Sequence, residues 1–436
     1  MDTSLLTGWL SWLVLGLGVA GSVFLLARRE RWWWLYVVPA VVVVAGVAAW
    51  LLGTIVAERL FAAPLTTSDI VWIAVALAAV PLAVGQLFRT PWWRKGVAVV
   101  AAIAVIAAAG NQINKNYQEF PAVKDLFGPS GTDEQAALPG RTPKSTPTVQ
   151  TTEPLTTSWI PTGSGIPTDG KGKVLPFDIP NTQSGFSARP AWVYLPPAYF
   201  ADNRTPLPVV ILYHGQPGSP DEWIFGDRVQ STMNAFAAQH NGIAPIVVMP
   251  DVLGSQLANP ICADSALGNV DTYLAKDVPA AITTQLDVDP DPKHWVVGGF
   301  SYGGTCSLQM ATNHPDRFPN FIDISGEKEP TRGSGDTARQ TTVADAFGGD
   351  ESKFIAINPA DLMQKNKYPH SAGWFVWGQN DPDYRSDQLH NYKLAKAAGM
   401  AVQTWESPGT AHDWATATAA LDHTMPWIAS TTGLTS

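Results

Sequence analysis

Cysteine and charged residues are scarce in this 436-residue chain, which has 2 cysteines and only 15% charged residues. The formal net charge is −9, so the chain lacks the excess of cations that marks a nucleic-acid-binding protein. A hydrophobic fraction of 46% excludes an intrinsically disordered chain. No group of His, Cys, Asp and Glu has the spacing of a metal site in the sequence. The sequence therefore predicts no metal ion, no other cofactor and no nucleic-acid partner.

The first 111 residues differ in composition from the rest of the chain. They hold 7 Lys/Arg against 4 Asp/Glu and 9 of the 18 tryptophans, whereas the remainder is strongly acidic. They also contain four long apolar runs, at residues 5–27, 34–57, 70–88 and 97–113. Each run is close to the ~20 residues that a helix needs to cross a bilayer. We therefore interpret residues 1–113 as a four-helix transmembrane anchor in the lipid bilayer.

The apolar runs contain no Asp, Glu, Lys, Arg or His. Because an ionisable side chain inside a span is the usual sign of a transport pathway, we expect these helices to act as an anchor. Cations gather instead in the first and third connections: Arg28, Arg29, Arg31, Arg89, Arg94 and Lys95. The positive-inside rule places both connections in the cytoplasm. Both termini and everything after residue 113 are then extracytoplasmic.

The first apolar run resembles a signal peptide only in its length. It lacks a basic leader and is followed directly by an arginine cluster, and both features favour an anchor over a cleaved segment. A multi-pass protein of the cell membrane, with its main domain outside, is the localisation that the sequence predicts.

Residues 114–173 form a second region, rich in Pro and Thr. Such a composition buries too little apolar surface to fold, so we expect an extended, semi-stiff linker. In residues 174–436, short apolar stretches typical of strands alternate with helical stretches. This alternation predicts an α/β domain with a mostly parallel sheet covered by helices.

A G-x-S-x-G pattern in this domain carries the strongest chemical signal. It runs from Gly299 to Gly303 and lies between a predicted strand at residues 294–298 and a predicted helix at residues 305–313. That is the context of a nucleophile elbow, in which the turn is so tight that the flanking positions must be small. We expect Ser301 to be the nucleophile; the alternative is a small-residue packing turn.

A serine nucleophile needs a base, and the base needs an acid that orients it. In chain order Ser, Asp, His, His412 is the best of the 8 histidines because it lies in a loop directly after the last predicted strand. The loop after the strand at residues 374–377 supplies Asp381 as the acid and Asp383 as the reserve. The alternative for both aspartates is ordinary turn formation.

The oxyanion of the acyl-transfer intermediate needs two N–H donors. The residue after the nucleophile, Tyr302, supplies the first. The second is expected from the loop after the strand at residues 208–213; Gln216 is the choice and Gly215 the alternative, because Pro217 has no N–H.

Several stretches of this domain resemble the putative esterase family, which includes esterase D, feruloyl esterases and the mycolyltransferases of actinobacterial envelopes. They read Y-H-G at residues 213–215, G-F-S-Y-G-G at 299–304, H-P-D-R-F at 314–318 continuing to S-G at 325–326, and G-T-A-H-D-W at 409–414. The resemblance covers roughly residues 175–430, and the membrane part is similar to an added anchor of actinobacterial envelope esterases. It implies the α/β-hydrolase fold and acyl-ester chemistry through Ser301, Asp381 and His412. The mycolyltransferases use a glutamate as the acid, whereas this loop offers only aspartates, and this difference favours a hydrolase.

The two cysteines, Cys262 and Cys306, both lie on the predicted outer side, where a pair in a compact domain favours a disulfide. The sequence thus predicts a membrane-anchored serine esterase that hydrolyses acyl or aminoacyl esters of an envelope lipid or an acylated sugar; the choice of substrate rests on location alone. An envelope acyltransferase with the same triad and a non-catalytic envelope-binding protein are the alternatives.

Overall fold

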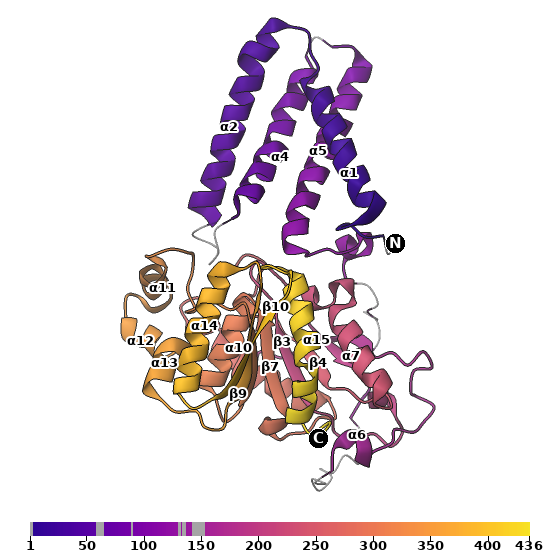
Figure 1. The fold of residues 1–436 in the computed structure, drawn as a ribbon, viewed down its shortest axis with the longest axis vertical. Helices are drawn as coiled ribbons and strands as arrows, with labels where there is room; N and C mark the ends of the chain where they lie inside the picture. Colours follow the sequence, from indigo (N-terminus) through magenta and orange to yellow (C-terminus); the bar gives the residue numbers. More distant parts are fainter. Residues whose placement is uncertain (1–2, 58–64, 89, 130–131, 133–136, 142–152) are drawn as a thin grey trace. The chain divides into compact units, whose positions relative to one another are not determined.

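A computed structural model of the chain describes all residues except 1–2, 58–64, 89, 130–131, 133–136 and 142–152 (Figure 1). The described chain divides into two units. A helical unit comprises residues 1–127, and an α/β unit comprises nearly all of residues 128–436.

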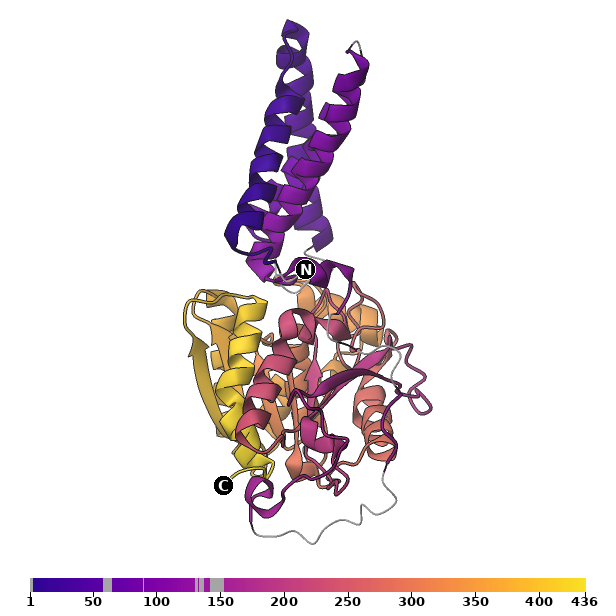
Figure 2. The same ribbon diagram turned by 90° about the vertical axis from the view of Figure 1, so that its right-hand side faces the viewer.

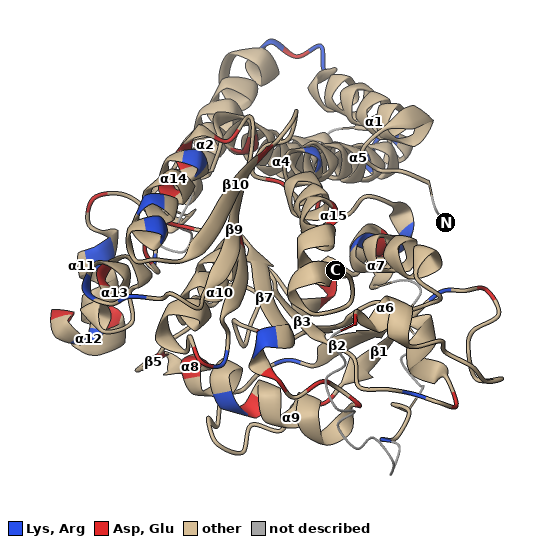
Figure 3. Ribbon diagram, turned by 60° about the horizontal axis from the view of Figure 1, so that its bottom comes forward, with Lys and Arg blue, Asp and Glu red and all other residues tan. Residues whose placement is uncertain are grey.

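The helical unit consists mainly of long helices that lie side by side (Figures 1 and 2). They are α1 (Gly8–Leu26), α2 (Val38–Leu51) with the π-helical turns Trp33–Val37 and Leu52–Val56 at its ends, α4 (Thr67–Gln86) and α5 (Trp92–Tyr117). Four helical segments in the described part of the chain are long and apolar enough to cross a membrane. Charged residues are nearly absent along these helices and gather near their ends (Figure 3).

Small residues form the inside of the helical unit. A Cβ added to Gly18 would lie 2.3 Å from the Cβ of Ala108, and one added to Gly21 would lie 2.8 Å from the carbonyl oxygen of Ala101. Helices α1 and α5 therefore approach as closely as small residues allow. Large apolar side chains, in contrast, are exposed, as with Trp12 and Val100. This inverted pattern is the one that a lipid environment favours.

The carboxyl end of α1 is capped by side chains from the other helices. The last carbonyls of a helix have no partner within it, and here those of Leu25 and Leu26 and of the next two residues accept hydrogen bonds from side chains. The pairs are Leu25 O with Gln86 Nε2 (2.8 Å), Leu26 O with Trp33 Nε1 (3.2 Å), Ala27 O with Arg94 Nη2 (2.6 Å) and Arg28 O with Trp34 Nε1 (2.8 Å). The buried guanidinium of Arg28 donates to Gly85 O at 2.8 Å. Arg28 and Arg94, two of the cations on which the predicted membrane topology depends, thus also hold the helices together.

The region expected to be a linker differs in part from an extended spacer. Helix α5 continues to Tyr117, and a 3-10 turn follows at Val123–Phe127. Further on, the short helix α6 (Leu155–Ser158) is hydrogen-bonded to the carboxyl terminus, with Leu155 N 3.0 Å from Gly433 O. Leu155 and Trp159 pack against the α/β core, because these apolar side chains bury surface there. Residues 130–131, 133–136 and 142–152 of the expected linker lie outside the described part of the chain.

An eight-stranded sheet forms the centre of the α/β unit. Its spatial order is β1-β2-β4-β3-β7-β8-β9-β10; β2 is antiparallel to both β1 and β4, and the other pairs are parallel. The strands are β1 (Lys173–Phe177), β2 (Ala191–Leu195), β3 (Val209–Tyr213), β4 (Ile246–Met249), β7 (Trp295–Phe300), β8 (Asn320–Ile324), β9 (Ala372–Gly378) and β10 (Ala401–Ser407). The prediction of a mostly parallel sheet is confirmed.

Helices cover both faces of this sheet (Figure 3). On one face lie α7 (Arg228–Gln239) and α15 (Trp414–Thr431), which pack against each other. The other face carries α9 (Val278–Gln285), α10 (Tyr302–Asn313) and α14 (Pro382–Ala397), with α13 (Pro359–Lys365) packed between α10 and α14. Shorter elements are β5 (Asp264–Ser265), β6 (Gly268–Asn269), α8 (Val270–Thr272), α11 (Ala338–Phe347) and α12 (Glu351–Ile355). Strands β3 and β7 are buried on both faces, so the loops that leave their carboxyl ends have rigid supports.

Candidate functional site

Ser301 occupies the sharp turn between β7 and α10. Its backbone has φ 56° and ψ −121°, a conformation that costs energy for any residue with a side chain. The hydrogen bond from Ser301 N to Ile324 O, 2.8 Å long, holds the turn against strand β8. A Cβ on Gly299 would lie 2.3 Å from Gly303 O, and one on Gly303 would lie 2.3 Å from Tyr213 O. The two glycines are therefore required by the close packing of the elbow.

Three side chains from three strand ends meet at this turn. His412, in the loop between β10 and α15, has its Nε2 atom 2.9 Å from Ser301 Oγ. Its Nδ1 atom lies 3.1 Å from Oδ2 of Asp381. Because a carboxylate can only accept, Nδ1 carries the proton of the neutral imidazole, and Ser301 Oγ–H donates to Nε2.

The loop after β9 decides between the two aspartates. Asp381 is 6% exposed and caps the amino end of α14, where it accepts from the N–H of Tyr384. Asp383 lies in the first turn of α14 with its side chain exposed. The structure thus brings Asp381, and not Asp383, to His412.

Of the predicted oxyanion residues, Tyr302 follows Ser301 directly, and the alternative Gly215 lies close to it. Tyr302 is the first residue of α10, so its N–H belongs to the first turn, where a helix has no internal acceptors. In the loop after β3, a Cβ added to Gly215 would lie 3.8 Å from the Cβ of Ser301. The next residue, Gln216, precedes a cis peptide bond to Pro217 and directs its side chain to Ala258 O, at 3.0 Å.

A buried ionic network that the sequence analysis missed supports this loop. Asp251 accepts from Arg189 Nη2 (2.7 Å) and contacts His214 Nε2 (3.1 Å), while Arg189 also donates to Gly218 O (2.8 Å). Burial raises the pKa of Asp251, but the hydrogen bonds from His214 and Arg189 outweigh it and hold that pKa well below its usual range. The sequence does hold an indication of this role. Asp251 follows β4 by two residues and therefore lies at the edge of the sheet where the carboxyl ends of the parallel strands meet.

The disulfide predicted from the sequence is present. Cys262 and Cys306 are bonded, with their Cα atoms 5.6 Å apart. The bond ties the loop before α8 to helix α10, which follows the nucleophile. Gln309 Nε2, donating to Ile261 O at 3.0 Å, and Cys262 N, donating to the hydroxyl of Tyr302 at 3.0 Å, reinforce the same contact. Helix α10, which follows the nucleophile, is therefore cross-linked to the loop before α8.

Two buried carboxyl groups lie near the carboxyl end of β8, Asp323 within the strand and Glu327 just after it. Asp323 is fully buried and accepts from Gly326 N at 3.0 Å, and Glu327 is 7% exposed. Burial raises the pKa of Asp323 to about 7 and that of Glu327 to about 8, from model-compound values of 3.8 and 4.5. Both groups therefore keep a proton in the folded protein at a pH where the unfolded chain has lost it.

This difference predicts how stability depends on pH. Where the folded state binds more protons than the unfolded state, the free energy of unfolding falls as pH rises, here from about pH 4 to about pH 8. Glu327→Gln removes one of the two titrating groups but keeps the shape of the protonated acid. We expect the thermal midpoint of this variant in detergent to fall less than that of the wild type between about pH 6 and pH 9.

Tryptophan fluorescence during heating measures these midpoints. Asp316→Asn, at an exposed position, is the control and should follow the wild-type curve. If the thermal midpoint of Glu327→Gln falls as much with pH as that of the wild type, the assignment of the titration to Glu327 is contradicted.

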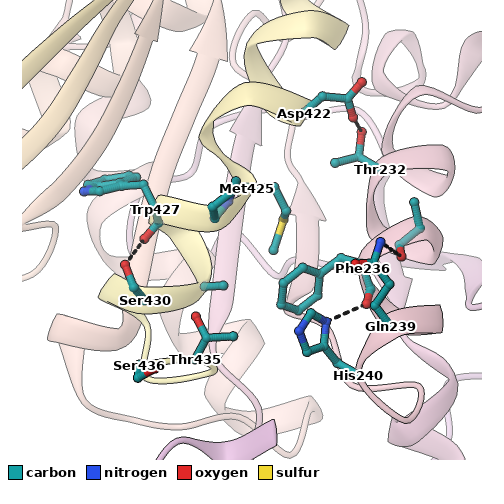
Figure 4. Close-up of a pocket in the computed structure, with 13 residues that line it drawn as sticks. Thr232, Phe236, Gln239, His240, Asp422, Met425, Trp427, Ser430, Thr435 and Ser436 are labelled. Atoms are coloured by element: carbon teal, nitrogen blue, oxygen red, sulfur yellow. Dashed lines mark hydrogen bonds between the residues drawn. The ribbon is translucent and has the colours of Figure 1, made fainter.

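One cavity lies away from these residues. It has a volume of about 660 Å³ and is bounded by α7, α15 and the carboxyl-terminal tail (Figure 4). Phe236 and Met425 give it an apolar side, and a hydrogen bond joins Thr232 Oγ1 to Asp422. It contains neither Ser301 nor His412, so we assign no catalytic role to it. Among the described residues, no group of three or more His, Cys, Asp or Glu could hold a metal ion.

The fold and the elbow define an α/β-hydrolase, and comparison with known proteins gives the family. Residues 187–429 match the putative esterase family, and the chain belongs to it. An uncharacterized protein of Corynebacterium glutamicum is 36% identical over 371 residues, which cover 84% of this chain and 82% of that protein.

The solved structure of a ferulic acid esterase has the same fold. It superposes with a TM-score of 0.51 at 20% identity, covering 60% of this chain and 99% of that one. An S-formylglutathione hydrolase from Agrobacterium tumefaciens superposes with a TM-score of 0.49 at 16% identity, over 61% of this chain and 97% of that one. Hydrolysis or transfer of acyl groups is the chemistry associated with the family.

Proposed function

We propose that this protein is a membrane-anchored, extracytoplasmic serine esterase with the triad Ser301, His412 and Asp381. The observation that carries the proposal is the pair of contacts at the elbow, 2.9 Å from Ser301 to His412 and 3.1 Å from His412 to Asp381. A base within hydrogen-bonding reach of a serine, itself oriented by a carboxylate, is the arrangement that activates the hydroxyl.

In the acylation step, Ser301 Oγ attacks the ester carbonyl carbon while its proton passes to His412 Nε2. The tetrahedral intermediate then breaks the bond to the alcohol, which leaves with that proton. In the second step, a water molecule gives a proton to Nε2 and its oxygen attacks the acyl carbon. The acid is released, and Ser301 Oγ recovers its proton from His412.

Charge develops on the carbonyl oxygen in both steps. The N–H groups of Tyr302 and Gln216 hold this oxyanion in our proposal. The position of Tyr302 at the start of α10 supports it, because the amino end of a helix favours negative charge. The Asp251 and Arg189 network, which fixes the loop at its Gly218 end, supports the second donor.

The anchor suggests where the substrate is found. Four apolar helices at the amino end would keep the enzyme at a membrane, and the cations of the first and third connections would keep the catalytic unit outside. Esters of an envelope lipid or of an acylated sugar are then the substrates within reach. The family and the structural likeness support acyl chemistry in general, and location alone supports this choice of substrate.

Product analysis tests the reaction. The purified full-length protein in detergent is incubated with a p-nitrophenyl ester, with and without an added acceptor alcohol. We expect release of the free acid in both cases. A new ester formed at the expense of free acid would identify a transferase, and no turnover together with no labelling by a fluorescent fluorophosphonate would contradict a serine enzyme.

Cysteine labelling tests the orientation. Arg29 and Lys353 are exposed and lie on opposite sides of the membrane in the proposed topology. We expect a membrane-impermeant maleimide added to intact cells to label Lys353→Cys and to leave Arg29→Cys unlabelled until the cells are lysed. The opposite pattern would overturn the extracytoplasmic placement.

A further inference from the structure

Tyr384 lies against the candidate triad, and neither the sequence motifs nor the family resemblance assigns it a role. It is 8% exposed and belongs to the first turn of α14, three residues after Asp381. Large buried aromatic side chains usually serve the core. The partners of Tyr384 set it apart, because its backbone contacts Asp381 and its ring contacts His412.

The backbone of Tyr384 meets Asp381. Its N–H donates to Oδ1 of Asp381 at 3.3 Å, the bond by which an amino-terminal cap satisfies the first turn of a helix. The other carboxylate oxygen, Oδ2, is the one that His412 Nδ1 contacts. The cap therefore fixes the rotation of the carboxyl group that orients the imidazole.

The ring of Tyr384 meets His412. The two rings are stacked, with their centroids 3.8 Å apart and their planes 20° apart. Phe300 also contacts the imidazole, with centroids 4.9 Å apart. An imidazole held in this way cannot turn about its χ2 angle without losing aromatic contact, and the positive charge that it gains during acylation is favoured by the face of an aromatic ring.

The hydroxyl of Tyr384 keeps its proton. Burial is the main cause that raises the pKa of Tyr384 well above its usual value, and the charge of Glu327 in its ionised form adds to the rise. The phenol is therefore neutral at physiological pH, and we assign no positioning role to its hydroxyl.

We propose that Tyr384 is a positioning residue of the triad, which sets the carboxylate of Asp381 by its backbone and the plane of His412 by its ring. This inference rests on the proposed function, since it concerns residues of the same triad. Substitution can remove the hydroxyl alone, or the ring together with the hydroxyl.

Three variants test the inference. Tyr384→Phe keeps the ring and removes the hydroxyl, whereas Tyr384→Leu and Tyr384→Met remove both. We expect kcat for p-nitrophenyl acetate to fall about 100-fold in the two ringless variants, the scale of loss that a misplaced catalytic group causes, and less than about 5-fold in Tyr384→Phe. KM should change little, because the contacts of Tyr384 are with the triad and not with the ester.

Tyr392, eight residues further along α14, is the matched control. It packs on Phe375, with ring centroids 6.2 Å apart, and has no contact with the triad in the hydrogen-bond and ring contacts of the described residues. Tyr392→Leu should leave kcat within about 2-fold of the wild type. Melting curves show which variants are folded, and Met serves as the ringless residue where Leu does not fold.

The outcomes separate the two proposals. The role of Tyr384 is overturned if the ringless variants keep kcat within about 3-fold of the wild-type value. An equally large loss of kcat in Tyr384→Phe would also overturn it, as would a rise in KM at constant kcat. The rate of fluorophosphonate labelling provides the distinction: a wild type that is not labelled defeats the proposed function itself, whereas ringless variants labelled as fast as the wild type defeat only the inference on Tyr384.

Discussion

Ser301→Ala should lower kcat/KM for ester hydrolysis by about 10⁴-fold or more, because no other group at the elbow can form the acyl-enzyme. The Cβ of the alanine fits the elbow, which already holds a Cβ at this position, so the protein should fold normally. The measurement is the rate of p-nitrophenyl ester hydrolysis by the purified variant in detergent. A fluorescent fluorophosphonate, which binds covalently to the activated oxygen with loss of fluoride, should label the wild type only.

Ser386→Ala is the control for this result. Ser386 is exposed on α14, and its variant should be labelled and active as the wild type is. Labelling that persists in Ser301→Ala would show that another residue is the nucleophile. Residual hydrolysis above about 10% of the wild-type rate would contradict covalent catalysis by Ser301.

Asp381→Asn should have the second largest effect, a fall in kcat of about 10⁴-fold. The amide has nearly the shape of the carboxylate, but its NH₂ group would favour the wrong tautomer of His412, in which Nε2 carries the proton and cannot accept one from Ser301. The cap of α14 needs only an acceptor at this position, so stability should change by no more than about 1 kcal/mol.

Asp383→Asn is the matched variant, because it makes the same chemical change two residues away. Asp383 is exposed, and we expect its variant to retain full kcat and an unchanged melting temperature. If Asp383→Asn loses activity while Asp381→Asn keeps it, the acid is misassigned.

Much of the fold followed from patterns along the chain. The strands predicted at residues 208–213, 294–298 and 374–377 coincide with β3, β7 and β9, because strands buried on both faces are continuous apolar runs. Strand β1 was not predicted. It is a short edge strand that contains Pro176, and proline is tolerated there but weakens the strand pattern.

The site was predicted less completely than the fold. Ser301 could be found because its elbow needs small residues at fixed positions, and His412 because it follows the last strand. Asp381 and Asp383 could not be told apart, since they are two residues apart in one loop. Asp251 and Tyr384 carry no motif, and their contacts with Arg189 and with His412 join residues far apart in the chain.

The sequence by itself determined the four apolar spans, the split in charge between the two parts of the chain, the parallel α/β architecture and the turn that presents Ser301. The charge split is a property of composition. The spans, the α/β pattern and the turn depend on the order of residues within about 25 positions, because helix length, strand burial and turn geometry are local properties. Only the tertiary structure decided which aspartate meets His412, that Tyr384 contacts both Asp381 and His412, and that residues 155–159 pack on the α/β unit. Several of these contacts join residues that are 31 to 278 positions apart, and such contacts are set by the packing of the whole core.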